Sequence, residues 1–148
     1  MSPRLPTAQQ LAKRLIDRER LRGDAEVTKA SAAALAAEEL CRGLSRWIGT
    51  DGCHALFSRA RAEALGDHPP LDALQLRARA EPYIEGVVEG VGEYGEIATA
   101  DAIESMLIGM IELLGRLIGV DMATNLIERS LPELARDDAD PEKRRAEA

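Results

Sequence analysis

The sequence predicts an all-α fold, a single-domain helical bundle of five or six helices. First, 24 Ala and 19 Leu, both good helix formers, supply more than a quarter of the 148 residues. Second, aromatic residues make up only 3% of the chain, whereas sheets are rich in aromatic and β-branched residues. Third, apolar residues recur at helical spacing between breaks that contain glycine or proline. A chain of this length can bury a core without disulfides or metals.

The first predicted helix follows Thr7 and ends at Gly23 and Asp24. Its apolar residues recur at intervals of three and four, which indicates one buried face; they are Ala8, Leu11, Ala12, Leu15 and Ile16. Residues 1–24 contain six Lys or Arg against three Asp or Glu, so this helix is basic. We expect it to be either peripheral to the bundle or swapped onto a partner chain.

A long alanine-rich helix is predicted from Ala25 to Ile48, and Gly49 ends it. Asp51 is placed to cap the next helix, which we expect from Gly52 to Leu65. The alanine run in the long helix favours a close approach to a neighbouring helix, although each alanine buries little area.

Residues 66–70 break the helical pattern, and two alternatives remain for residues 71–81: a short helix or an extended connection. Pro82 suits the first position of another helix, in which Gly86 and Gly90 favour a close crossing with a neighbour. Opposite its apolar face lies an acidic stripe, which we interpret as solvated rather than as a carboxylate metal site; it contains Glu81, Glu85, Glu89 and Glu93.

The next predicted helix begins at Ile97 or Asp101 and ends before Gly119. Asp121 is placed to cap the last helix, which we expect from Met122 to Leu131. The single helical domain then covers residues 1–134, and the charged tail 135–148 is expected to be frayed or disordered.

Two segments of the chain resemble each other at a constant offset of 70 residues. Residues 44–59 and 114–129 share seven of sixteen positions without a gap. We interpret this as an internally duplicated αα-hairpin, residues 25–66 and 96–134. The matched residues at the two hairpin corners are Arg46, Gly49 and Asp51 in the first copy, and Arg116, Gly119 and Asp121 in the second. The alternative is chance similarity between leucine-rich helices.

The candidate soft metal ligands are Cys41, Cys53, His54 and His68, and their spacing matches no zinc site. Cys41 aligns with Ile111 in the duplication, which is typical of a core position. There is no glycine-rich phosphate loop after a strand and no arrangement of serine, histidine and aspartate typical of a hydrolase. The sequence therefore predicts no metal site and no cofactor.

Residues 102–120 form an almost wholly apolar stretch that is interrupted by Glu104, Glu112 and Arg116. Glu112 and Arg116 lie four residues apart. At this spacing they favour an ion pair within the helix. The alternative is that both face a ligand, in a pocket that also contains Trp47, Met106 and Met110.

Charge divides unevenly along the chain, which carries a formal net charge of −7. Between Arg79 and Arg116 there are eight Asp or Glu and no Lys or Arg, so we expect the basic N-terminal helix to pack near this block. The acidic balance makes nucleic acid an unlikely partner. We expect no membrane span, because the most apolar stretch is interrupted by charges, and no leader peptide, so the expected location is the cytoplasm of a bacterial-type cell.

These features favour a non-enzymatic module for protein–protein interaction or regulation that acts as a homodimer. The alternative is a helical bundle that senses a small molecule in an apolar interior pocket. A third hypothesis is an enzyme that uses Asp51 and His54 as an acid–base pair, which requires both side chains to face one cleft.

Overall fold

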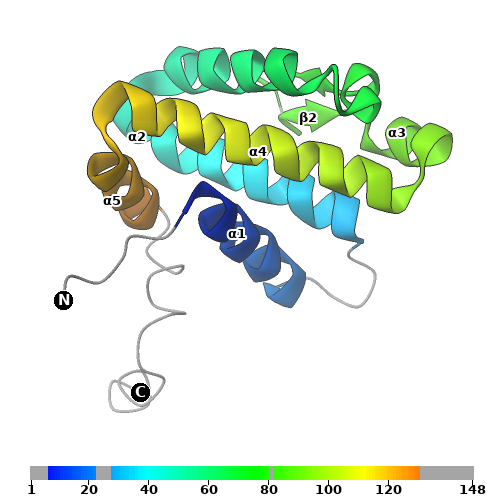
Figure 1. Cartoon of the computed structure of the whole chain (residues 1–148), viewed down its shortest axis with the longest axis horizontal. Helices are drawn as coiled ribbons and strands as arrows, with labels where there is room; N and C mark the ends of the chain where they lie inside the picture. The colour runs from blue at the N-terminus through cyan, green and yellow to red at the C-terminus, as the bar shows by residue number, and fades with distance from the viewer. Residues whose placement is uncertain (1–6, 23–27, 81, 131–148) are drawn as a thin grey trace.

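The computed structural model describes residues 7–22, 28–80 and 82–130, and within them the chain is an all-α bundle (Figure 1). The prediction of the fold class is confirmed. The elements are α1 (Ala8–Arg22), α2 (Lys29–Ala64), a 3-10 segment η1 (Pro69–Ala73), β1 (Gln75–Leu76), β2 (Ile84–Glu85), α3 (Val87–Tyr94), α4 (Glu96–Ile118) and α5 (Val120–Ser130). The predicted ends at Gly23, Asp24 and Leu131, and the tail 135–148, lie outside the described residues.

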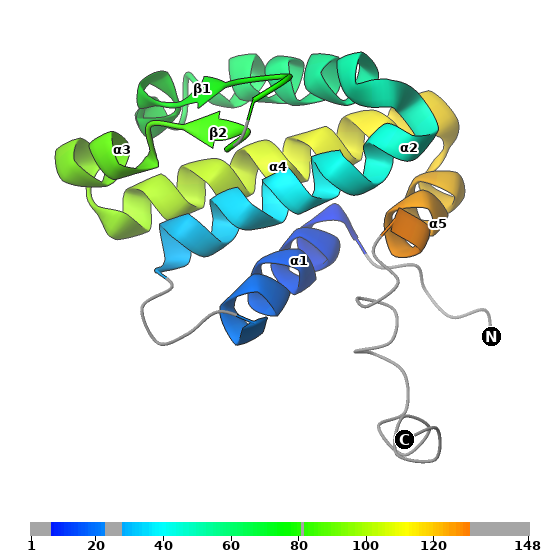
Figure 2. The same ribbon diagram turned by 180° about the vertical axis from the view of Figure 1, so that it is seen from behind.

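Two long helices form the centre of the bundle. The first part of α2 and the whole of α4 lie side by side and run in the same direction, as Figures 1 and 2 show from opposite sides. The alanine run of α2 permits this approach, because Ala32, Ala33, Ala36 and Ala37 are all buried. α1 packs across both helices and contributes Leu11 and Leu15 to the core. None of the described helices has the length and apolarity needed to cross a bilayer.

The two predicted corners lie where the sequence places them. Gly49 interrupts α2 with φ 81° and ψ 158°, and Gly119 separates α4 from α5 with φ 92° and ψ 147°. A side chain is strained at such positive φ values, so glycine is favoured there. After Gly49 the second part of α2 folds back along the bundle, and after Gly119 α5 turns to the opposite side (Figure 1).

The predicted capping role of the two corner aspartates is wrong. Helix resumes directly after each glycine, so Asp51 and Asp121 lie inside the first turn rather than before it. There their carboxylates still favour the positive end of the helix dipole. The duplication itself stays a prediction, because Gly95, outside the matched segments, has a similar backbone conformation.

Side-chain oxygens accept hydrogen bonds from backbone N–H groups at the starts of the helices. Thr7 and Gln10 form a reciprocal pair in which each backbone N–H donates to the other side chain, at 2.9 and 3.1 Å. Thr28 caps α2 by accepting from the N–H of Ser31 at 3.1 Å. The Glu96 carboxylate at the start of α4 accepts from the N–H of Ala30 at 3.1 Å, which ties the two central helices together at this end.

Residues 71–81 combine both alternatives that the sequence left open. A 3-10 turn ends at Ala73, and an extended segment then pairs antiparallel with a second one, Leu76 opposite Ile84. The predicted helix start at Pro82 is wrong, because Tyr83 and Ile84 are buried before the helix, with Ile84 in the strand pairing, and the helix begins at Val87.

The glycines expected to permit a close crossing do so within this chain. A Cβ on Gly86 would lie 2.1 Å from the carbonyl oxygen of Ala73, and a Cβ on Gly90 would contact Thr99 at 3.4 Å. Gly86 stands before α3 with φ 99°, so α3 begins only at Val87. In the acidic stripe, Glu85, Glu89 and Glu93 are exposed, as the solvated interpretation requires, and Glu81 lies outside the described residues.

The basic helix α1 packs against the acidic helix α4 of the same chain, as its charge suggested. Lys13 and Arg20 of α1 line a surface hollow together with Asp101 and Glu104 of α4. Opposite charges thus face each other across the α1–α4 contact.

Candidate functional site

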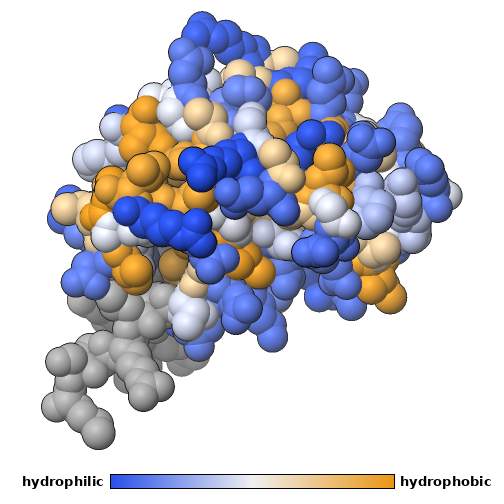
Figure 3. All heavy atoms as spheres, turned by 45° about the horizontal axis from the view of Figure 1, so that its top comes forward, coloured by the Kyte–Doolittle hydropathy of each residue, from blue (hydrophilic) through white to orange (hydrophobic). Residues whose placement is uncertain are grey.

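Both corners lie at the same end of the molecule, and apolar side chains are exposed around them (Figures 1 and 2). Leu117 is 70% exposed and Trp47 is 52% exposed, values far above those of the core. Figure 3 shows hydrophobic side chains gathered at this end, on the left of the view, with strongly hydrophilic ones between them. We define the corner surface by its exposed apolar residues, Trp47, Leu117, Ile118, Val120 and Met122.

Charges of both signs surround the corner surface. Arg46 and Arg116 precede the two corner glycines and are exposed, and Asp51 and Asp121 follow them and are also exposed. The Asp51 carboxylate is 3.3 Å from the guanidinium of Arg79, and this pair is exposed on both sides. The charged rim is therefore available to solvent and to a partner.

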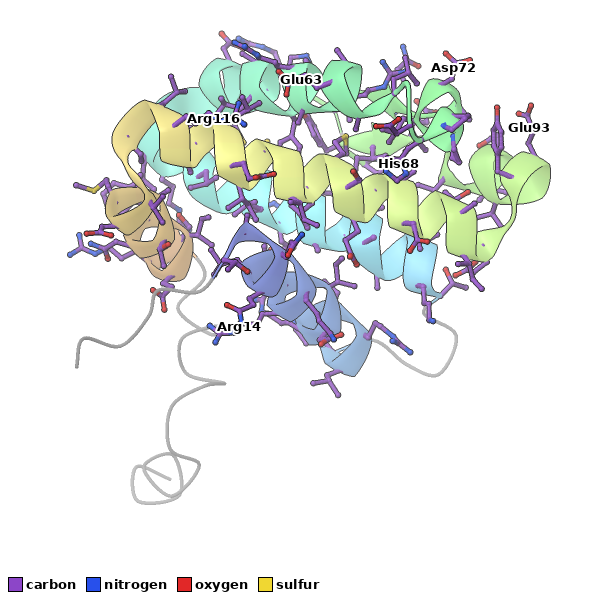
Figure 4. The ribbon with its side chains drawn as sticks, in the orientation of Figure 1. Arg14, Glu63, His68, Asp72, Glu93 and Arg116 are labelled. Atoms are coloured by element: carbon purple, nitrogen blue, oxygen red, sulfur yellow. The ribbon has the colours of Figure 1, made fainter. Side chains whose placement is uncertain are left out.

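A pocket of about 350 Å³ lies between α1, α4 and α5. Its walls include the apolar residues Leu11, Ile111 and Val120, and the two polar side chains of Glu112 and Arg116. Among the described residues no ion pair links Glu112 to Arg116, although their spacing favours one. Both are exposed, and Figure 4 shows Arg116 near the end of α4.

The other residues of the predicted ligand pocket lie elsewhere. Met106 and Met110 have no exposed surface and fill the core, and Trp47 belongs to the corner surface. The structure thus brings Glu112 and Arg116 to one pocket and separates them from Trp47, Met106 and Met110.

Two free thiols lie on either side of the bend at Gly49. Cys41 is in the first part of α2 and Cys53 is in the second part. Cys53 is fully buried, whereas Cys41 is 6% exposed and forms part of the wall of a pocket of about 310 Å³.

Tyr83, from the segment before α3, lines the same pocket as Cys41. Its hydroxyl lies 3.0 Å from Nδ1 of His54, and its ring packs edge-on against Phe57 with centroids 5.8 Å apart. Its backbone N–H donates to the carboxylate of Glu38 at 3.3 Å. The pocket beside Cys41 is lined by Glu38, Cys41, Arg42, Ser45, Thr50, Ala78, Arg79, Ala80 and Tyr83.

The thiols of Cys41 and Cys53 have different pKa values. The hydrogen bond from Cys53 lowers the pKa of Cys41, and burial works against this effect. The same bond, together with burial, raises the pKa of Cys53 far above its usual range. Burial also raises the pKa of Tyr83.

The structure does not bring Asp51 and His54 together. His54 bonds to Tyr83 and lies 3.4 Å from the hydroxyl of Ser58, while Asp51 pairs with Arg79 on the surface. Within the described ranges no three His, Cys, Asp or Glu side chains are grouped so that they could hold a metal ion. His68 is half-buried in the turn before η1. Figure 4 shows it in the right half of the bundle, away from Arg116 on the left.

Comparisons with models of protein families, with curated proteins and with solved structures find no match to this chain.

Proposed function

We propose that this protein is a non-enzymatic interaction or regulatory module that forms a homodimer through the corner surface. The supporting observation is the exposure of Trp47, Leu117, Val120 and Met122 at one end of a bundle whose core is otherwise well filled. Grouped exposed apolar side chains of this size are typical of interaction sites. The same end carries both corners, so one face presents segments from α2, α4 and α5.

The charges at the rim favour a second copy of this chain as the partner. A twofold dimer uses the same patch on both subunits, so that patch must complement itself. Arg46, Arg79 and Arg116 offer three positive charges, and Asp51 and Asp121 offer two negative ones. This end therefore carries charges of both signs although the chain carries −7, and two copies can pair them with each other.

The mass of the protein in solution tests the dimer. We expect light scattering after gel filtration to give twice the chain mass of 16.0 kDa at micromolar concentration. Leu117→Glu is expected to give monomer, because it places a charge in the centre of an apolar contact. Val88→Glu is the matched control, since Val88 is 82% exposed at the other end of the bundle.

A monomeric wild-type protein at this concentration overturns the proposal. A dimer that persists in Leu117→Glu also contradicts it, as does a dimer that Val88→Glu disrupts equally. Melting curves of both variants should match the wild type after correction for dissociation, since neither side chain is part of the core.

The proposal includes a reducing compartment such as the cytoplasm. Cysteines that remain free are typical of compartments where disulfide formation is disfavoured. The acidic net charge supports a protein partner over nucleic acid.

A second candidate function is favoured by the pocket at Glu112 and Arg116. A guanidinium and a carboxylate beside three aliphatic residues suit the two charges and the side chain of an aliphatic amino acid. Titration with leucine, followed by calorimetry, tests this sensor role. Glu112→Gln and Arg116→Gln should each weaken binding about tenfold or more, and heats equal to buffer dilution in the wild type contradict it.

A further inference from the structure

Another pocket lies between the first part of α2 and the segment that contains β2 and α3. Figure 2 shows this segment at the end of the bundle opposite α5, and therefore away from the corner surface. The volume of the pocket is about 370 Å³, which is typical of sites for small molecules. We call it the α2–α3 groove. Its walls are mostly aliphatic and include Ala34, Leu35, Ile84, Val87, Val88 and Val91.

Two carboxylates also line the groove, one toward each end of it. The Glu96 carboxylate accepts from the backbone N–H of Ala30, near the start of α2, at 3.1 Å. The Glu38 carboxylate accepts from the backbone N–H of Tyr83 at 3.3 Å. Ala30 and Glu38 are separated by about 12 Å along the helix axis, given the rise of about 1.5 Å per residue. The groove is thus an apolar channel with a negative charge toward each end.

Both carboxylates can accept further hydrogen bonds. A carboxylate has about four acceptor positions, and the backbone bond occupies only one of them in each case. The guanidinium of Arg42 lies 3.7 Å from Glu38, beyond hydrogen-bonding distance, whereas it lies 2.6 Å from Glu39. Within the described ranges no basic side chain forms an ion pair with Glu96. The Glu38 side chain is only 15% exposed, so water solvates its charge incompletely.

We propose that the α2–α3 groove binds a linear aliphatic dication, a molecule with an ammonium group at each end of an alkyl chain. The alkyl chain packs against Leu35 and the valines of α3, and one ammonium group donates to Glu38 while the other donates to Glu96. Hydrogen bonds between charged groups of this kind are stronger than those between neutral groups. This site is separate from the corner surface and does not depend on the dimer proposed above.

The charges around the groove favour a cation over an anion. Glu85 precedes α3, and Glu89 and Glu93 are exposed on it. The chain has no Lys or Arg between Arg79 and Arg116, so a ligand that approaches from α3 meets a negative field. The aliphatic walls between the carboxylates favour an alkyl chain over a polar linker. A ligand with a single ammonium group leaves one carboxylate without a cation, so the second ammonium group adds affinity.

Calorimetric titration of the full chain with α,ω-diaminooctane tests the proposal. Both amines of this molecule are charged at pH 7, and its extended chain matches the spacing of the two carboxylates. We expect saturable binding of one molecule per chain. Octylamine has the same chain and one charge, so it should bind about tenfold more weakly or worse. α,ω-Octanediol, without charge, should bind more weakly still, and α,ω-diaminobutane should also lose about tenfold because it is too short to reach both carboxylates.

Three glutamine variants distinguish direct contacts from the general negative field. Glu38→Gln and Glu96→Gln keep an oxygen for the backbone N–H and remove the charge, so each should weaken the binding of α,ω-diaminooctane about tenfold or more. Glu93→Gln is the matched control, because Glu93 is exposed on α3 and does not line the groove. Its affinity should change by less than about twofold. Melting curves verify that the three variants keep the fold.

Three outcomes overturn the proposal. The first is a wild-type titration with α,ω-diaminooctane that gives only the heat of dilution. The second is octylamine or the diol binding as tightly as the diamine, which refutes contact at both ends. The third is an equal loss of affinity in Glu93→Gln and in the two groove variants. The comparison of ligands uses the wild type alone, so it decides the question even if a variant does not fold.

Discussion

The hydroxyl of Tyr83 lies 3.0 Å from Nδ1 of His54, and this contact joins the segment before α3 to the second part of α2. The two residues are 29 positions apart in the sequence, so the contact depends on how that segment packs against the helix. Several measurements test this contact and the packing that surrounds it.

The pH dependence of alkylation at Cys41 should depend on the donor at position 53. In Cys53→Ala the hydrogen bond is lost, so the pKa of Cys41 rises and its reaction with iodoacetamide requires a higher pH. In Cys53→Ser a hydroxyl donor remains, so the pH profile should stay close to that of the wild type. Equal profiles for the alanine and serine variants contradict the role assigned to the bond.

Tyr83 makes the folded state less stable at alkaline pH. Burial raises the pKa of its hydroxyl above 10, the ordinary value, so above pH 10 the unfolded chain releases this proton while the folded chain retains it. The free energy of unfolding contributed by this group is thus complete below pH 10 and declines as the pH rises further.

The variant Tyr83→Phe should therefore show a weaker decline of stability above pH 10 than the wild type in urea titrations. At neutral pH it should be less stable by about 1 kcal/mol, because it loses the bond to His54. Tyr94→Phe is the control, since Tyr94 is exposed and should leave the alkaline decline unchanged. If the free energy of unfolding declines above pH 10 as much in Tyr83→Phe as in the wild type, the assignment to Tyr83 is wrong.

Gly43 is where the end of α5 meets α2 most closely. A Cβ there would lie 2.8 Å from Cβ of Ser130 and 3.0 Å from its carbonyl oxygen, so Gly43→Ala forces α5 outward. We expect a loss of about 1–3 kcal/mol in the free energy of unfolding. Gly52→Ala, on the same helix with its nearest neighbour at 3.7 Å, should be neutral or stabilising by up to about 1 kcal/mol. Equal effects of the two variants in denaturant titrations would refute this packing.

Alanine substitutions at Gly86 and Gly49 distinguish the cost of a steric clash from the cost of backbone strain. At Gly49 a Cβ meets nothing within 4 Å, so Gly49→Ala should cost only the strain of its backbone conformation, about 1–3 kcal/mol. At Gly86 the same φ problem is joined by a clash at 2.1 Å with the backbone of Ala73. Gly86→Ala should thus be the more destabilising variant by chemical denaturation, and the reverse order contradicts the placement of α3 beside η1.

Local features of the sequence suffice for the start of the first helix and for two of the helix breaks. The start after Thr7 and the breaks at Gly49 and Gly119 were predicted because hydrogen-bond capping and positive φ depend on a few neighbouring residues. The helix predicted at Pro82 failed for the opposite reason. Pro82 is compatible with a helix start, but the burial of Tyr83 and Ile84 and the pairing with Leu76 are gained only in the extended form.

The candidate site shows the same division. The sequence by itself determined that Glu112 and Arg116 stand one turn apart in an apolar helix, because helical spacing is a local property. Only the tertiary structure decided that they line a pocket with α1 and α5 while Met106 and Met110 fill the core.

For the two cysteines, too, the sequence determined that the chain reverses at Gly49, and the tertiary structure decided that Cys53 is sealed in the core while Cys41 borders a pocket with Tyr83. The physical reason is that a residue's backbone preferences depend on its neighbours in the chain. Its contacts depend instead on the angle and distance at which separate helices pack, and those are set by side chains far away in the sequence.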